Sequence, residues 1–449
     1  MRALLHRVDN GGAWRDQLGF GLVVAALWAF QSAAFGPLGR AYLHVIHLND
    51  SSKPVGPYVF LHPAFLCAAL LMLLRHRSSS DSAGAGSKCG IAAALGCWMC
   101  GATLSTLLHV GADHVLMTYC SVFLAGTAVY IAFARTPVSP RGLEVAFIGL
   151  AAGSLVPLVG GIQAFVREFG PADIDTTLSA YRNLFRMELY EAATFGSRGN
   201  TATFVIIVAP LFLWTALDRA RGRLIRTLST AMLVPIVVNL LILEIRAAFL
   251  ALLFAVAVVF GFKLGLRRYP LFVVGLGVAL LLLVRYSPDI TVMMSDRLRP
   301  VVTMDTAEDA SVMERAASVD EGLTLAKKNW LLGIGPGASV TRHSQTAAHQ
   351  FEVQEFMEVG VFGLVASALF SIGVLLMLAR TLARGQDLGT NNMRFALLIG
   401  PATFVVYGIF SNPTLTVGYV NTWSVLVASM VALVPGFEST GARRRLAEI

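Results

Sequence analysis

Charged residues are scarce in this chain, and the sequence has no long stretch with the composition of a soluble domain. Only 14% of its 449 residues are charged, whereas 56% are hydrophobic. The mean hydropathy of +0.67 lies far above that of ordinary soluble domains. These values exclude a soluble globular protein, and they predict an all-α polytopic fold whose helices are embedded in a bilayer.

Cysteines and metal ligands are also few. The five cysteines lie in or beside apolar segments near the N-terminus, so they do not suggest a disulfide framework. Cys97 and Cys100 form a C-x-x-C pair with no second pair nearby, and we interpret both as packing residues. We find no ligand cluster that would clearly hold a divalent ion. We therefore expect no metal, no cofactor and no nucleic acid partner.

Apolar runs of the length of a spanning helix, roughly 20 residues, recur along almost the whole chain. They predict about twelve transmembrane helices, which we place at 18–36, 55–74, 90–110, 114–134, 143–164, 201–217, 228–243, 248–262, 269–284, 358–379, 395–410 and 418–434. Lysine and arginine are distributed so that both termini face the cytoplasm. The predicted organisation is 1–164 with helices 1 to 5, 165–200 as a first long periplasmic loop, 201–284 with helices 6 to 9, 285–357 as a large periplasmic loop, and 358–449 with helices 10 to 12 and a cytoplasmic tail.

The two long loops are rich in arginine. Residues 311–328 of the second loop carry apolar side chains at helical spacing, and they predict a helix lying on the membrane face that ends at Trp330. A guanidinium binds phosphate oxygens in a bidentate way, so the arginines favour a site for a phosphate-bearing lipid. The alternative is that they pair with acidic residues of the same loops or contact headgroups. The cations are Arg167, Arg182, Arg186 and Arg198 in the first loop and Arg285, Arg297, Arg299, Arg315, Lys327, Lys328 and Arg342 in the second.

Arg246 lies between two apolar runs that predict a tight helical hairpin. An arginine inside the membrane is costly, which makes it a candidate functional residue. The alternative is an ion pair with Glu244, two residues away.

The stretch from Trp330 to Leu364 contains the densest group of motifs. Gly333, Gly335 and Gly337 indicate a compact turn, although glycines at this spacing are a weak phosphate signal without a strand-to-helix unit. His349 follows, just before the helix that we expect to begin near Glu358. A neutral histidine can accept a proton from a hydroxyl. The alternative for such a loop histidine is a solvated polar side chain.

These motifs resemble the superfamily of bacterial O-antigen ligases and O-antigen polymerases. The family pattern is a helix with an arginine, a tryptophan, a G-x-G-P-G turn, a histidine and E-x-G-x-x-G at the next membrane helix. The matching residues are Arg246 in EIRAAFLALL, Arg315, Trp330, Gly333-Ile334-Gly335-Pro336-Gly337, His349-Gln350, Glu358-Val359-Gly360 and Gly363. Gln350 replaces the asparagine that usually follows the family's histidine. Upstream, Arg246 matches the arginine of the family's S-R-G motif, in which Ile245 replaces the serine. The resemblance extends from Arg198, before NTATFVIIVAPLFLW, to Val434.

The resemblance implies a membrane glycosyltransferase with a C-type-like fold in the bacterial inner membrane. Its donor would be a glycan on undecaprenyl pyrophosphate, and its ligase acceptor would be a lipid A core sugar hydroxyl on the periplasmic face. Since a lipid pyrophosphate is a good leaving group, charge stabilisation matters more than covalent chemistry. The implied roles are catalysis by His349, pyrophosphate binding by Arg198, Arg246 and Arg315, and support from Glu358, Arg342 and Arg186, with membrane lipids around the site. Glu358 would hold His349 or cap the start of a helix.

Other functions stay open from the sequence alone. Within the superfamily, a polymerase for O-antigen or exopolysaccharide and a protein O-oligosaccharyltransferase differ from the ligase in their acceptor. We favour the ligase because the chain has one major outer loop and no large soluble C-terminal domain. A transporter or flippase of a lipid-linked solute is a different class. We see no repeat between the two halves of the chain, and the charges gather in the outer loops, so the sequence speaks against it.

Overall fold

We analysed a computed structural model of the chain. The structure describes residues 21–29, 89–108, 130–131, 140–169, 193–194, 198–219, 221–243, 245–264, 310–335, 348, 350–383, 389–411, 427 and 430–434. Regular elements in these ranges are helical, as the composition predicted. The main elements are α4 (Cys89–Leu108), α6 (Pro140–Phe169), α9 (Arg198–Leu217), α10 (Arg223–Leu243), α11 (Arg246–Leu264), α14 (Ala310–Lys328), α16 (Phe351–Val359), α17 (Val361–Ala383) and α18 (Gly389–Phe410).

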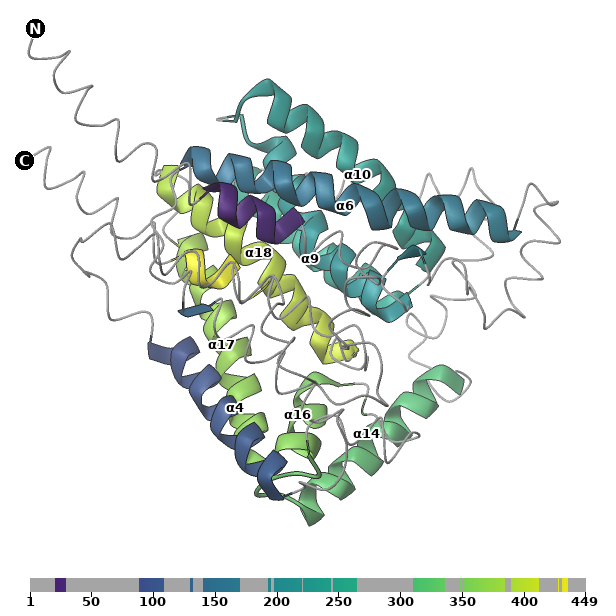
Figure 1. Ribbon diagram of the computed structural model, residues 1–449, viewed down its shortest axis with the longest axis vertical. Helices are drawn as coiled ribbons and strands as arrows, with labels where there is room; N and C mark the ends of the chain where they lie inside the picture. The colour runs from purple at the N-terminus through teal and green to yellow at the C-terminus, as the bar shows by residue number, and fades with distance from the viewer. Residues whose placement is uncertain are drawn as a thin grey trace, which may run out of the picture.

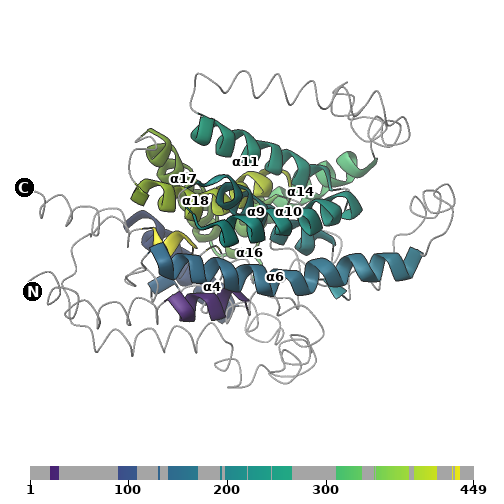
Figure 2. The same ribbon diagram turned by 90° about the horizontal axis from the view of Figure 1, so that it is seen from above.

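Helix α9 forms the centre of the bundle. Its side chains are almost all buried, among them Phe204, Phe212 and Trp214. It packs against α10, α11 and α18, and α6 covers α10. Figure 2 shows α11 and α6 on opposite sides of α9, and Figure 1 shows α17 between α4 and α18. A helix that is apolar on every side is what a position inside a membrane bundle requires.

Close helix contacts depend on small residues. Gly149 and Gly153 of α6 face the helical segment 21–29, and a Cβ atom on Gly153 would lie 2.2 Å from the Ala29 carbonyl oxygen. A Cβ on Gly149 would lie 2.4 Å from the Ala25 carbonyl oxygen. Small residues four apart are a common way for membrane helices to bring their backbones together. The same residues in a soluble helix would only lower its stability.

In the part of the chain that the structure describes, five helices are long and apolar enough to cross a membrane. They are Gly142–Arg167, Arg198–Leu217, Arg223–Leu243, Val361–Ala383 and Asn392–Phe410, and a shorter apolar helix covers Ala247–Lys263. The membrane fold is therefore supported. The total of about twelve spans stays a prediction, because the helices predicted at 55–74 and 269–284 lie outside the described residues, and those at 114–134 and 418–434 lie mostly outside them.

Several predicted bounds differ from the observed ones, including the following three. Helix α6 continues to Phe169, so the first long loop starts later than residue 165. Helix α9 begins at Arg198, which makes this arginine part of a helix rather than of the loop. A short helix that was not predicted, α16, precedes α17, and the two meet at Gly360. The predicted helix of the second loop is confirmed as α14, which lies beside α16 at the lower right of Figure 1. Its place on the membrane face stays a prediction.

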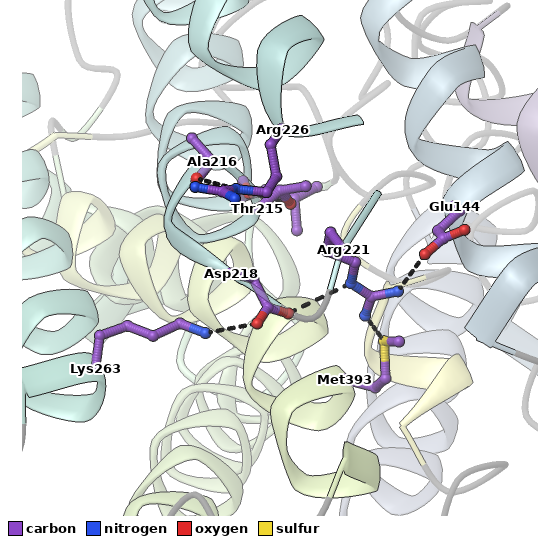
Figure 3. A network of polar contacts seen from close by, with 9 residues as sticks. Glu144, Thr215, Ala216, Asp218, Arg221, Arg226, Lys263 and Met393 are labelled. Atoms are coloured by element: carbon purple, nitrogen blue, oxygen red, sulfur yellow. Dashed lines mark hydrogen bonds and ion pairs between the residues drawn. The ribbon is translucent and has the colours of Figure 1, made fainter. Parts of the chain in front are cut away.

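The end of the bundle where α9 stops contains a buried charge network (Figure 3). The Arg221 guanidinium donates to Asp218 over 3.3 Å and to Glu144 over 3.1 Å, and it also contacts the sulfur of Met393. The Lys263 ammonium lies 3.2 Å from the second oxygen of Asp218. The network therefore connects the turn after α9 with α6, α11 and α18.

Trp214 completes this network from inside the bundle. The Lys263 ammonium lies 4.6 Å and the Arg221 guanidinium carbon 5.6 Å from the centroid of its ring. Contacts of this kind stabilise cations that are removed from water. Two cations and two carboxylates thus balance one another at the end that the sequence places on the cytoplasmic side.

Candidate functional site

Arg198 and Arg246, two of the predicted pyrophosphate ligands, begin two helices that meet at the opposite end of the bundle. Arg198 is the first residue of α9, and Arg246 is the first residue of α11. The Arg198 side chain donates a 2.7 Å hydrogen bond from Nη2 to the carbonyl oxygen of Leu243, the last residue of α10. The structure thus brings Arg198 to the turn that leads into Arg246. The side chain of Arg246 lies outside the described atoms.

The electrostatics of this corner favour an anion. The N-terminal end of a helix carries free N–H groups and a partial positive charge, so a cation there is unfavourable unless an anion offsets it. Here both helices begin with arginine. In addition, the buried Nε atom of Arg198 has no hydrogen-bond partner among the described residues. The guanidinium therefore keeps an unused donor that a phosphate oxygen would satisfy.

Arg315 reaches the same end from α14. It lies within electrostatic range of the phenol of Tyr407 in α18, whose hydroxyl forms side-chain hydrogen bonds with Ser411 and with Thr203 of α9. Tyr407 is buried, with 1% of its surface exposed. Thr203 also donates to the carbonyl of Gly199 in the first turn of α9. Arg198 therefore lies at the start of α9, and Arg315 lies near the end of α18.

The glycine turn binds protein backbone in this structure. The backbone N–H groups of Ile334 and Gly335 donate to the carbonyls of Met357 and Glu358, over 2.9 Å and 3.0 Å. In the other direction, the N–H of Val361 donates to the carbonyl of Trp330 over 2.7 Å. We call these contacts the glycine clasp. It fastens the segment after α14 to the junction of α16 and α17.

Two glycines make the clasp possible. Gly333 has φ 71° and Gly360 has φ 70°, a region that residues with a Cβ rarely adopt. A Cβ on Gly333 would lie 2.3 Å from the backbone carbonyl of Glu358, and one on Gly360 would lie 2.3 Å from the Leu331 carbonyl oxygen. The two glycine motifs of the sequence are therefore two halves of one contact.

Glu358 is connected to the residue that precedes His349. The Ala348 N–H donates a 2.9 Å hydrogen bond to the side-chain oxygen of Gln354, and the Gln354 amide nitrogen donates a 2.5 Å bond to the carboxylate of Glu358. All three residues are buried. Glu358 lies in the last turn of α16, so the capping role at a helix start does not fit its position. Its supporting role for His349 stays a prediction.

A second buried carboxyl, Glu355, was not singled out by the sequence analysis. It accepts a 2.7 Å hydrogen bond from the indole N–H of Trp98 in α4. Burial raises the pKa of Glu355 to about 8, and the charge of Glu358 adds to the rise, whereas the bond from Trp98 lowers it. At neutral pH the carboxyl is therefore mainly protonated, which allows α16 to pack against α4.

Several predicted site residues lie outside the described part of the chain. They are His349, Arg186 and Arg342, and nothing in the structure tests their roles. In the residues that are described, no group of three or more His, Cys, Asp or Glu side chains is arranged to hold a metal ion. The metal-free site thus stays a prediction.

A comparison with protein-family models finds a match that covers part of the candidate site. Residues 231–368 match the family model Wzy_C, described as O-antigen ligase. The match supports the resemblance of this chain to the O-antigen ligase and polymerase superfamily. Members of this superfamily are glycosyltransferase-like enzymes that act on lipid-linked glycans. The match includes Arg246, Arg315 and the glycine clasp, whereas Arg198 precedes it. No match to the chain is found among curated proteins.

Proposed function

We propose that this protein belongs to the O-antigen ligase and polymerase superfamily and is an O-antigen ligase of the bacterial inner membrane. It transfers a glycan from undecaprenyl pyrophosphate to a sugar hydroxyl of the lipid A core, at an active site that faces the periplasm. The observation that supports this proposal most is the cationic corner formed by Arg198 at the start of α9 and Arg246 at the start of α11, with Arg315 in electrostatic contact with Tyr407 of α18.

The arginines match what the leaving group requires. When the bond between the anomeric carbon and the phosphate oxygen breaks, its electron pair goes to the pyrophosphate and negative charge grows there. Cations that are fixed before the reaction stabilise this charge without reorganisation. The contact of Arg198 with Leu243 fixes its guanidinium, and its Nε, which has no hydrogen-bond partner among the described residues, leaves a donor for the phosphate. Arg186 and Arg342 would add contacts to the donor from the loops.

His349 would act on the acceptor. The attacking sugar hydroxyl forms the new bond to the anomeric carbon, and its proton passes to the neutral imidazole. Gln354 accepts a hydrogen bond from the N–H of Ala348 and donates one to Glu358. The backbone of Ala348, the residue before His349, is therefore fixed to α16. Glu358 thus supports the base through Gln354 and the backbone.

A reconstituted transfer assay tests the proposal. The purified full-length protein is incubated with an undecaprenyl-pyrophosphate-linked glycan and lipid A core acceptor, in detergent and without a membrane gradient. We expect the glycan on the core sugar, and we expect Arg198→Ala to abolish most transfer. Arg380→Ala, an exposed arginine near the end of α17, is the matched control and should transfer normally.

The same assay distinguishes the alternatives. If the glycan is added to a second lipid-linked repeat and not to the core, the protein is a polymerase. Glycan on serine or threonine of an added acceptor protein indicates a protein O-oligosaccharyltransferase. If no product forms but the lipid-linked glycan crosses a liposome membrane, the enzyme proposal is wrong and a flippase is indicated.

A further inference from the structure

A group of exposed residues at the end of α14 and directly after it is not used by the proposed reaction. Trp330 and Leu331 are large hydrophobic residues with 57% and 48% of their surfaces exposed. The two residues that end α14, Lys327 and Lys328, are exposed as well. We call these four residues the tryptophan–lysine patch. Two lysines beside a tryptophan and a leucine give a surface that is both cationic and apolar.

The glycine clasp fixes the depth of this patch. The carbonyl of Trp330 accepts a hydrogen bond from the N–H of Val361. Val361 is the first residue of a candidate membrane span, Val361–Ala383. Trp330 therefore lies level with the point where α17 enters the membrane. Figure 1 shows the end of α14 at the lower edge of the molecule, next to the ends of α4 and α16.

The chemistry of the patch fits that depth. A tryptophan ring is amphipathic, and tryptophan is enriched where the hydrocarbon core meets the headgroups. Lysines at this level keep their ammonium groups among the headgroups and are attracted to anionic lipids. The acidic residues of α14 that are nearest to the lysines, Asp320 and Glu321, lie about two turns before them, away from the patch.

We propose that the tryptophan–lysine patch is an interfacial anchor that binds anionic phospholipid headgroups of the leaflet where α17 begins. Trp330 and Leu331 insert among the upper acyl carbons, and Lys327 and Lys328 contact the phosphates. The anchor attaches the C-terminal end of α14 to the bilayer surface, whereas Arg315 lies nearer its other end. The proposal does not depend on which reaction the protein catalyses.

Fluorescence quenching tests where Trp330 lies. The full chain and Trp330→Phe are reconstituted into phosphatidylglycerol-containing nanodiscs, and the difference between their emissions isolates Trp330 from the other tryptophans. We expect lipids brominated near the headgroup to quench this difference strongly and aqueous iodide to quench it weakly. Strong quenching by iodide, with no effect of brominated lipid, overturns the anchor. Trp330→Phe retains an aromatic ring, so folding should be preserved.

A lipid titration tests the role of the two lysines. Phosphatidylglycerol should raise the melting temperature of the detergent-solubilised protein more than phosphatidylcholine does. We expect Lys327→Ala with Lys328→Ala to lose about half of this difference, whereas Asp320→Asn on the exposed face of the same helix keeps it. An unchanged difference in the double variant contradicts headgroup binding at this patch. Protection of Trp330 from both quenchers would indicate a protein partner and would also overturn the proposal.

Discussion

The side-chain amide of Gln354 donates a 2.5 Å hydrogen bond to the carboxylate of Glu358, one helical turn further along α16. Its oxygen accepts the N–H of Ala348, so one glutamine connects the residue before His349 to the clasp. Gln354 is 3% exposed, and its partners have little access to water that could replace it.

The first prediction concerns this glutamine. Gln354→Leu keeps the approximate volume but removes the hydrogen bond from the Ala348 N–H and the hydrogen bond to the Glu358 carboxylate. We expect the rate of transfer to fall roughly tenfold or more, because a buried partner left unsatisfied costs about 1–3 kcal/mol. Donor affinity should change little, because the change lies on the acceptor side of the site. Separate determination of kcat and of the KM for the donor provides the check. A raised KM with normal kcat would place Gln354 in donor binding instead.

The second prediction separates His349 from Arg246. If His349 removes the hydroxyl proton, His349→Ala should lose roughly a hundredfold to ten-thousandfold in rate with near-normal donor binding. Arg246→Ala should weaken both donor binding and rate, and Arg246→Lys should recover only part of each, because the bidentate fork is lost. Single-turnover kinetics with a donor-binding assay measure both effects. Near-normal transfer by His349→Ala rules out its role as base.

The third prediction concerns the glycine clasp. Gly360→Ala places a Cβ 2.3 Å from the Leu331 carbonyl oxygen and forces an alanine to φ 70°. We expect a loss of about 2 kcal/mol in stability and a marked fall in transfer. Gly96→Ala in α4, where a Cβ would meet nothing within 4 Å, is the matched control. Thermal unfolding in detergent measures both variants. Equal melting temperatures would show that the clasp is not needed for stability.

The fourth prediction is a pH dependence that arises from Glu355. Its pKa is about 8 in the folded protein and 4.5 in its reference state, so the folded protein holds this proton more tightly. Stability should therefore fall as the pH rises from 4.5 to about 8, and this contribution should be constant above that range. Glu355→Gln cannot ionise and should flatten the curve of melting temperature against pH. Asp320→Asn, which changes an exposed carboxylate, should leave the curve unchanged. If the melting temperatures of the parent protein and of Glu355→Gln fall in parallel as the pH rises, Glu355 is not the group responsible.

Part of this arrangement could be predicted from sequence because it depends on local patterns. The periodicity of residues 311–328 gave α14 almost to the residue, and the motifs around Arg246 and Gly333 to Gly363 led to the family that the model match supports. Arg198 stood at the edge of an apolar run, which is where helix α9 begins.

The remaining features arise from contacts between segments that are distant in sequence. The Trp98–Glu355 bond joins residues 257 positions apart, and a tryptophan inside an apolar helix gives no sign of such a partner. The break between α16 and α17 was missed because apolar residues continue on both sides of Gly360. Its positive φ becomes understandable only once the Leu331 carbonyl is packed against it. The glycine turn was weighed as a phosphate site, yet its N–H groups at Ile334 and Gly335 bind the backbone of α16.

The charge network at the other end of the bundle also constrains biogenesis. Ribosomal synthesis delivers Glu144 and Asp218 before Arg221, but Lys263 and Met393 follow only when α11 and α18 have been made. Until then Asp218 lacks its second cation, and Arg221 lacks the sulfur against which it packs. The network can therefore close only after α18 has been inserted, so the final docking of the helices must follow translation of most of the chain.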